Sequence, residues 1–192
     1  MTYEWLAQFG GESGLVLITD ADAFRDWTGA VYDDDYRLDP DCDYARLMAV
    51  VFADDDEVEA AAIDAGIVWQ MEDAGIAEVA TGDRGLLIMR SWADDSGEPA
   101  RAFAAGSAGQ ETEVTAGELQ IASGRVAVVW APVAGSDATL RGTQIDCPGM
   151  LNLGTVVPLP PGRYTAAYGS HEDDGWSCRW IRFDRQPGTD KP

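Results

Sequence analysis

The sequence is short of positive charge and of long apolar runs. Only 13 Lys and Arg residues stand against 34 Asp and Glu, so the formal net charge of the 192-residue chain is −21. A chain this acidic is repelled by DNA, RNA and anionic membrane surfaces, and any large charged partner should be basic. No apolar run approaches the roughly 18 residues that span a bilayer. Because residues 1–8 also lack the features of a secretion signal, we expect a cytoplasmic location.

Cysteine, histidine and lysine are scarce. The three cysteines, Cys42, Cys147 and Cys178, make an odd count without a C-x-x-C spacing, and His171 is the single histidine. This pattern predicts neither a disulfide framework nor a zinc site. The single lysine, Lys191, lies near the end of the sequence and no phosphate-binding G-x-x-x-x-G-K-[ST] motif occurs, so nucleotide binding is not indicated.

What the chain has in abundance is short apolar segments separated by glycines, which is typical of strands. A β-branched run at residues 14–19 ends at Asp20, which we interpret as the N-cap of a short helix over 21–27. A second helix is expected over 98–105, and further strands at 47–52, 67–71, 86–92 and 176–183. Ser123-Gly124 and Pro160-Pro161-Gly162 each lie between two apolar runs and predict β-hairpins.

The order of these segments predicts an α+β fold of predominantly antiparallel strands, with one or two short helices and a β-rich C-terminal half. A Gly/Ser/Ala stretch at 106–110 separates residues 1–106 from residues 111–186. We expect the two halves to pack as one globular unit, followed by a tail at 187–192.

Motifs that would carry chemistry are incomplete. Gly10-Gly11-Glu12-Ser13-Gly14 lacks the final glycine of a nucleophile elbow, and His171 lies in a polar segment that we read as an exposed turn. Asp39, Asp41 and Asp43 have the spacing of a calcium loop, but Tyr44 and Val50 occupy the positions that need Gly and Glu.

We therefore expect no catalytic residue, cofactor or bound metal. Two alternatives stay open. One is a small hydrolase or lyase that uses two of the many carboxylates. The other is a calcium- or carbohydrate-binding β-module that uses the loop at 39–43.

Negative charge is concentrated in one part of the chain. Between Asp20 and Asp64 there are 15 acidic residues against three arginines, which places −12 of the total −21 in under a quarter of the sequence. Aromatic residues lie among or near these acids: Trp5, Trp27, Tyr32, Tyr36 and Tyr44. Aromatic anchors inside a charged rim are typical of protein interfaces, so this segment predicts an electronegative face that steers and holds a basic partner.

A series of motifs follows in order along the first half. It consists of Trp5, the Gly10-Gly11 pair, Trp27-Thr28-Gly29, Asp43-Tyr44-Ala45-Arg46, the strand at 67–71 with Glu72-Asp73, and Leu87–Asp94 with Arg90 and Trp92. This ordered set resembles the immunity protein 21 family of bacterial polymorphic toxin systems over about residues 3–96. The tract at 54–59 is longer than the resemblance leads us to expect, and Ser91 separates Arg90 from Trp92.

The resemblance implies a cytoplasmic antidote that binds a cognate toxin domain. Together with the charge pattern it suggests a set of partner-binding residues: Asp33, Asp34, Asp35, Tyr36, Asp41, Asp54, Asp55, Asp56 and Glu57. The motif residues are expected to support the architecture instead: Trp5, Gly11, Trp27, Gly29, Asp43, Tyr44, Arg46, Arg90 and Trp92. Among these, Trp27 would be buried, Gly29 would allow a turn, and Arg46 or Arg90 would hold carboxylates in bidentate pairs.

Overall fold

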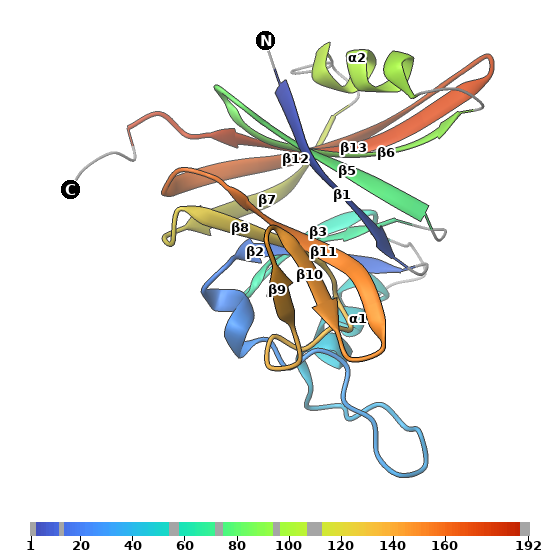
Figure 1. Cartoon of the computed structure of the whole chain (residues 1–192), viewed down its shortest axis with the longest axis vertical. Helices are drawn as coiled ribbons and strands as arrows, with labels where there is room; N and C mark the ends of the chain where they lie inside the picture. Colours follow the sequence, from blue (N-terminus) through green and yellow to red (C-terminus); the bar gives the residue numbers. More distant parts are fainter. Residues whose placement is uncertain are drawn as a thin grey trace.

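Two antiparallel sheets stack face to face in the computed structural model, which describes residues 3–11, 14–53, 58–71, 75–93, 97–106 and 113–188 (Figure 1). The first sheet has six strands, in the order β1 (Tyr3–Gly11), β5 (Gly75–Gly82), β6 (Gly85–Ala93), β13 (Trp176–Arg185), β12 (Gly162–Asp173) and β7 (Val114–Ile121). The second has seven strands, in the order β3 (Ala60–Ile63), β4 (Gly66–Gln70), β2 (Leu15–Asp20), β8 (Arg125–Trp130), β11 (Met150–Pro158), β10 (Gln144–Cys147) and β9 (Thr139–Arg141).

Alternating side chains of both sheets fill the space between them. Val16 and Ile18 of β2 pack there with Ile67 and Trp69 of β4 and with apolar side chains of the six-stranded sheet. Leu15 and Leu17 of β2 face the opposite way, into a second cluster that we call the outer cluster. Because both faces of β2 are covered, all six of its residues are buried, which explains its uninterrupted apolar run.

Short helices cover the outer face of each sheet. On the seven-stranded sheet lie the single 3₁₀ turn η1 (Ala23–Asp26) and α1 (Asp43–Val51), which buries Leu47 and Val51. On the six-stranded sheet, α2 (Glu98–Gly106) packs through Ala100 and Ala104 against Met89 and Trp180. The predicted α+β fold dominated by antiparallel strands, with short helices, is confirmed.

The strand predicted at 47–52 is wrong, because this segment belongs to α1. Residues 44, 47, 48 and 51 follow the spacing of one helix face, and all four contribute to the outer cluster. Cys42 caps the helix, its sulfur accepting a hydrogen bond from the Ala45 N–H at 3.4 Å. The helix predicted over 21–27 is reduced to η1, whose N-cap is Asp22 and not Asp20.

The two predicted hairpins are also wrong. Ser123-Gly124 joins β7 of one sheet to β8 of the other, and Pro160-Pro161-Gly162 joins β11 to β12 in the same way. The two corners lie side by side, since Leu159 N–H donates to Gly124 O at 3.1 Å. The hydroxyl of Tyr164 donates to Pro160 O at 2.6 Å, and this bond holds the second corner.

Both sheets combine strands from the two sides of residue 106. Residues 107–112, which hold most of the predicted connection, lie outside the described residues, as do residues 189–192 of the predicted tail. Pro187 and Gly188 form a turn. Neither α1 nor α2 exceeds nine residues, and no helix in the described ranges is long and apolar enough to cross a membrane.

Candidate functional site

A loop projects from the outer side of the seven-stranded sheet and carries several of the predicted partner-binding residues (Figure 1). We call residues 30–42 the acidic loop. At its base, the Ala30 N–H donates to Pro132 O at 2.9 Å and the Asp39 N–H donates to Val31 O at 2.8 Å. Tyr32 and Leu38 form an isolated antiparallel bridge. The loop is therefore held as a short ribbon and presents one defined shape.

Asp33 organises the tip of the acidic loop. One oxygen of its carboxylate accepts hydrogen bonds from the backbone N–H groups of Asp35 and Arg37, both at 2.9 Å. The backbone carbonyl of Asp33 accepts from the Tyr36 N–H at 3.0 Å. Tyr36 adopts a positive φ of 59° and its side chain is 89% exposed. The tip thus presents Tyr36 to solvent beside the exposed Asp34 and Asp35.

Exposed apolar side chains gather in the same part of the chain. Among the described residues, eleven large apolar side chains are exposed, and six of them lie between residues 31 and 58: Val31, Tyr32, Tyr36, Val50, Phe52 and Val58. These six residues share one stretch of sequence with the predicted acidic residues, so we take this stretch as the candidate interaction surface. Of the other predicted partner-binding residues, Asp41 is exposed at the end of the loop, whereas 54–57 fall outside the described residues.

The Trp-x-Gly and Asp-Tyr-x-Arg motifs meet at the base of the acidic loop. The buried indole of Trp27 donates from Nε1 to Ala131 O at 2.8 Å. Gly29 has a φ of +64°, and a Cβ there would lie 2.5 Å from Pro132 O. Thr28 and Asp43 form a reciprocal pair, in which the Asp43 N–H donates to Thr28 Oγ1 at 2.9 Å and the Thr28 N–H donates to Asp43 Oδ2 at 2.8 Å.

Two further motif residues complete this base. The backbone N–H of Tyr44 donates to Gly29 O at 3.2 Å, and its ring packs on the outer cluster. Arg46 contacts one oxygen of Asp43 at 3.2 Å and donates to Asp41 O at 2.6 Å. This geometry differs from the expected bidentate pair, because the guanidinium divides its donors between a carboxylate and a carbonyl.

The remaining motif residues lie in the six-stranded sheet. Trp5 packs against the apolar cluster between α2 and the six-stranded sheet, and the Arg101 guanidinium lies 5.7 Å from its ring centre. Gly11 pairs with Gly75 at the end of β1. The buried Arg90 donates to Met71 O at 2.7 Å and lies 4.6 Å from the ring centre of Trp92. The structure thus divides the motif residues between the two sheets.

The carboxylates at 39, 41 and 43 do not converge as in a calcium loop. Oδ1 of Asp39 accepts from the Asp41 N–H at 2.9 Å, and Asp43 is engaged with Thr28 and Arg46. Within the described ranges, no group of three or more His, Cys, Asp or Glu residues could hold a metal ion.

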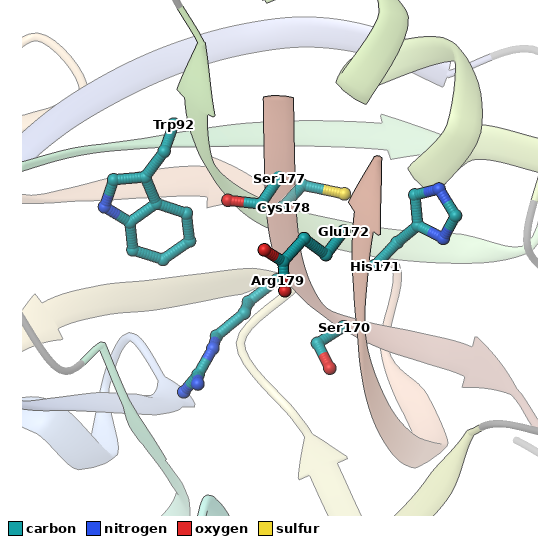
Figure 2. A pocket seen from close by; sticks show the side chains of 7 residues that line it. All are labelled: Trp92, Ser170, His171, Glu172, Ser177, Cys178 and Arg179. Carbon is teal, nitrogen blue, oxygen red and sulfur yellow. The ribbon is translucent and has the colours of Figure 1, made fainter. Parts of the chain in front are cut away.

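A hollow of about 510 Å³ lies over the ends of β6, β12 and β13 (Figure 2). Its lining combines residue types found in nucleophilic sites: Trp92, Ser170, His171, Glu172, Ser177, Cys178 and Arg179. His171 lies in β12 and stacks on Phe103 with the ring centres 3.9 Å apart, so its prediction as an exposed turn residue is wrong.

The hollow has the residue types of a nucleophilic site, but its thiol is not in the reactive form. Burial raises the pKa of Cys178 to about 12, so its thiol is protonated at neutral pH. A thiol nucleophile needs the thiolate, which a basic or electropositive neighbour normally stabilises. Ser13, the serine of the incomplete elbow motif, lies outside the described residues.

Sequence reasoning missed three polar contacts that hold separate segments together. Asp20 accepts from the N–H groups of Ala122 and Ser123 at 2.7 and 2.8 Å, and Glu113 pairs with Arg182. The carboxylate of Glu78 accepts several hydrogen bonds from Arg101. No local signal identifies these contacts, because the partners lie far along the chain.

Comparison with known proteins finds no matching family model, curated protein or solved structure.

Proposed function

We propose that this chain is a cytoplasmic immunity protein that binds a basic toxin domain, most simply a nuclease, and blocks its substrate groove. Its action is stoichiometric occlusion and involves no turnover. The observation that carries this proposal is the coincidence, between residues 31 and 58, of concentrated negative charge with most of the exposed large apolar side chains of the described chain. The resemblance of the N-terminal motifs to the immunity protein 21 family supports the same function.

The two kinds of side chain have different roles in such a complex. Carboxylates act at long range, and they raise the rate at which a positively charged partner arrives. Aromatic side chains act at short range, because they bury a large area with few rotatable bonds. Tyr36, which is 89% exposed at the tip of the acidic loop, is the anchor best placed to enter a groove on the partner.

The bonding within the acidic loop favours tight association. Asp33 and the Tyr32–Leu38 bridge already order the tip before any partner arrives. A preordered loop loses less conformational entropy on binding, so more of the contact energy appears as affinity. Protection of a cell would require a Kd of nanomolar order, which corresponds to about −12 kcal/mol.

The test is to co-express the chain with the toxin domain encoded by the neighbouring gene, and to measure survival and complex formation by size exclusion. Tyr36→Ala should weaken binding by about 30-fold, the value typical of an aromatic hot spot. A D34N/D35N double variant should slow association at low salt and reduce its salt dependence.

The matched control is D173N/D174N, which removes two neighbouring acids at the end of β12 and in the turn that follows it (Figure 1). This variant has the same net charge as D34N/D35N and should bind like the wild type. Cell death on co-expression, with no complex in solution, would overturn the proposal.

A further inference from the structure

A hollow of about 310 Å³ opens between α1 and the turn that joins β3 to β4. The buried Trp27 and Leu47 are among its lining residues. The half-exposed Val50 and the neighbouring Ile63 extend this apolar lining. A cavity lined in this way favours an aliphatic group over a hydrated one.

Carboxylates also line the hollow, and they differ in how they are used. Asp43 shares its oxygens between Thr28 and Arg46, and is therefore partly neutralised. Asp64 is exposed, and within the described part of the chain its carboxylate has no hydrogen-bond or ion-pair partner. Arg46 also lines the hollow, but its guanidinium is engaged by Asp43 and by the Asp41 carbonyl. The hollow thus joins an apolar lining to a second carboxylate, that of Asp64, which can accept a cation.

The hollow belongs to the same surface as the acidic loop. Its lining residue Asp43 is hydrogen-bonded to Thr28, and the next residue, Tyr44, is hydrogen-bonded to Gly29. Thr28 and Gly29 come immediately before the acidic loop. The negative field of this segment attracts cations, so a positively charged group that approaches the loop also approaches the hollow.

We infer that this hollow receives an arginine side chain of the toxin domain, an inference that rests on the proposed function. The three methylene groups of arginine would lie against Val50 and Ile63, and the guanidinium would pair with Asp64. Arginine fits better than lysine because its guanidinium is more weakly hydrated and offers paired donors to a carboxylate. A neutral aliphatic side chain would leave Asp64 without a cation.

The test uses small probes and does not require the toxin. Methyl-labelled protein is titrated with Nα-acetyl-arginine amide and with its neutral isostere, Nα-acetyl-citrulline amide, while the methyl resonances of Leu47, Val50 and Ile63 are followed. The arginine probe should give saturable shifts of these methyl groups. Its affinity should exceed that of the citrulline probe by about three- to fivefold, the effect of one exposed ion pair.

Variants connect this preference to Asp64. Asp64→Asn should remove the difference between the two probes, whereas Asp83→Asn, in the exposed turn between β5 and β6, should preserve it. Equal affinity for both probes in the wild type, or shifts that do not saturate, would overturn the inference.

The toxin complex separates this inference from the proposed function. If the toxin binds the wild type and a D64N/V50A variant equally well, the hollow is not used and only the inference fails. If the toxin does not bind the wild type, the proposed function fails, and the inference fails with it. A loss of affinity in D64N/V50A alone, with D83N unchanged, supports both.

Discussion

Glu113 and Arg182 form a bidentate ion pair in which the side chains are only 6% and 4% exposed. Arg182 Nη2 donates to Glu113 Oε2 at 2.7 Å, and the indole of Trp180 donates to the other oxygen at 3.1 Å. Arg182 also contacts Asp184 at 2.9 Å. The pair links Glu113, which immediately precedes β7, to Arg182 in β13, although the two residues are 69 positions apart in the sequence.

Glu113→Gln should therefore destabilise the protein strongly. The substitution leaves the Arg182 charge buried without its full partner, and breaking a buried pair costs about 3 to 5 kcal/mol. Urea unfolding measures this loss. The control is Arg163→Gln, because Arg163 and Glu118 form an exposed pair at 3.7 Å, with side chains 54% and 55% exposed. Its loss should stay below about 1 kcal/mol, and equal losses in the two variants would contradict the prediction.

The acid stability of the fold should depend on Asp20. Burial alone would raise the pKa of this carboxyl, but the N–H groups of Ser123, Ala122 and Asp22 outweigh burial and lower the pKa below its usual 3.8. Because the folded pKa is the lower one, the carboxylate stabilises the fold fully above the unfolded pKa. This stabilisation is lost as pH falls through the lowered folded pKa.

Asp20→Asn should thus cost about 2 kcal/mol of unfolding free energy at neutral pH. Both carboxylate oxygens of Asp20 accept hydrogen bonds, whereas the NH2 group of an amide can only donate. It should also flatten the decline in unfolding free energy below about pH 5. Urea titrations at several pH values measure both effects. If wild type and variant declined in parallel in acid, Asp20 would not be the responsible group.

Gly29 and Gly142 provide a matched pair of glycines. Their φ angles are +64° and +65°, but a Cβ at Gly29 would meet Pro132 O at 2.5 Å, whereas nothing lies within 4 Å at Gly142. Alanine at Gly142 should cost only the left-handed backbone penalty of about 1 to 2 kcal/mol. Alanine at Gly29 should lower the unfolding free energy by about 1 to 3 kcal/mol more, because the backbone at 132–134 must shift. Comparable melting temperatures for G29A and G142A would contradict this account.

The cysteines should differ in reactivity. With a pKa of about 12, Cys178 has roughly one thiolate in ten thousand at about pH 8, and it is 1% exposed. The half-buried Cys147 has a pKa raised by burial and by Asp137 and Asp146, but it is more accessible. Iodoacetamide labelling, followed by peptide mass spectrometry, should modify Cys147 before Cys178. All three cysteines should react in urea, and early labelling of folded Cys178 would show that β13 opens readily.

Local patterns were sufficient where a segment's own residues decide its conformation. The strands at 67–71 and 86–92 and the helix at 98–105 appear as β4, β6 and α2. The segment at 47–52 has a continuous apolar run like that of a strand, but it forms a helix because residues 44, 47, 48 and 51 repeat with the period of one helix face. For the candidate site, charge and aromatic content singled out the acidic loop, but the hollow at Asp64 needs α1 and β3, which local patterns do not place together.

The sequence by itself determined the charge, the abundance of short strands and the glycine-rich turns, because these depend on composition and on neighbouring residues. Only the tertiary structure decided which sheet each strand joins. Ser123-Gly124 and Pro160-Pro161-Gly162 look like hairpin turns locally, yet both pass between sheets. The bonds that hold these corners and edges, from Asp20 to Ala122 and from Glu113 to Arg182, join residues 102 and 69 positions apart. Such pairs form only when burial brings distant segments together, because burial is what makes an unpaired polar group costly.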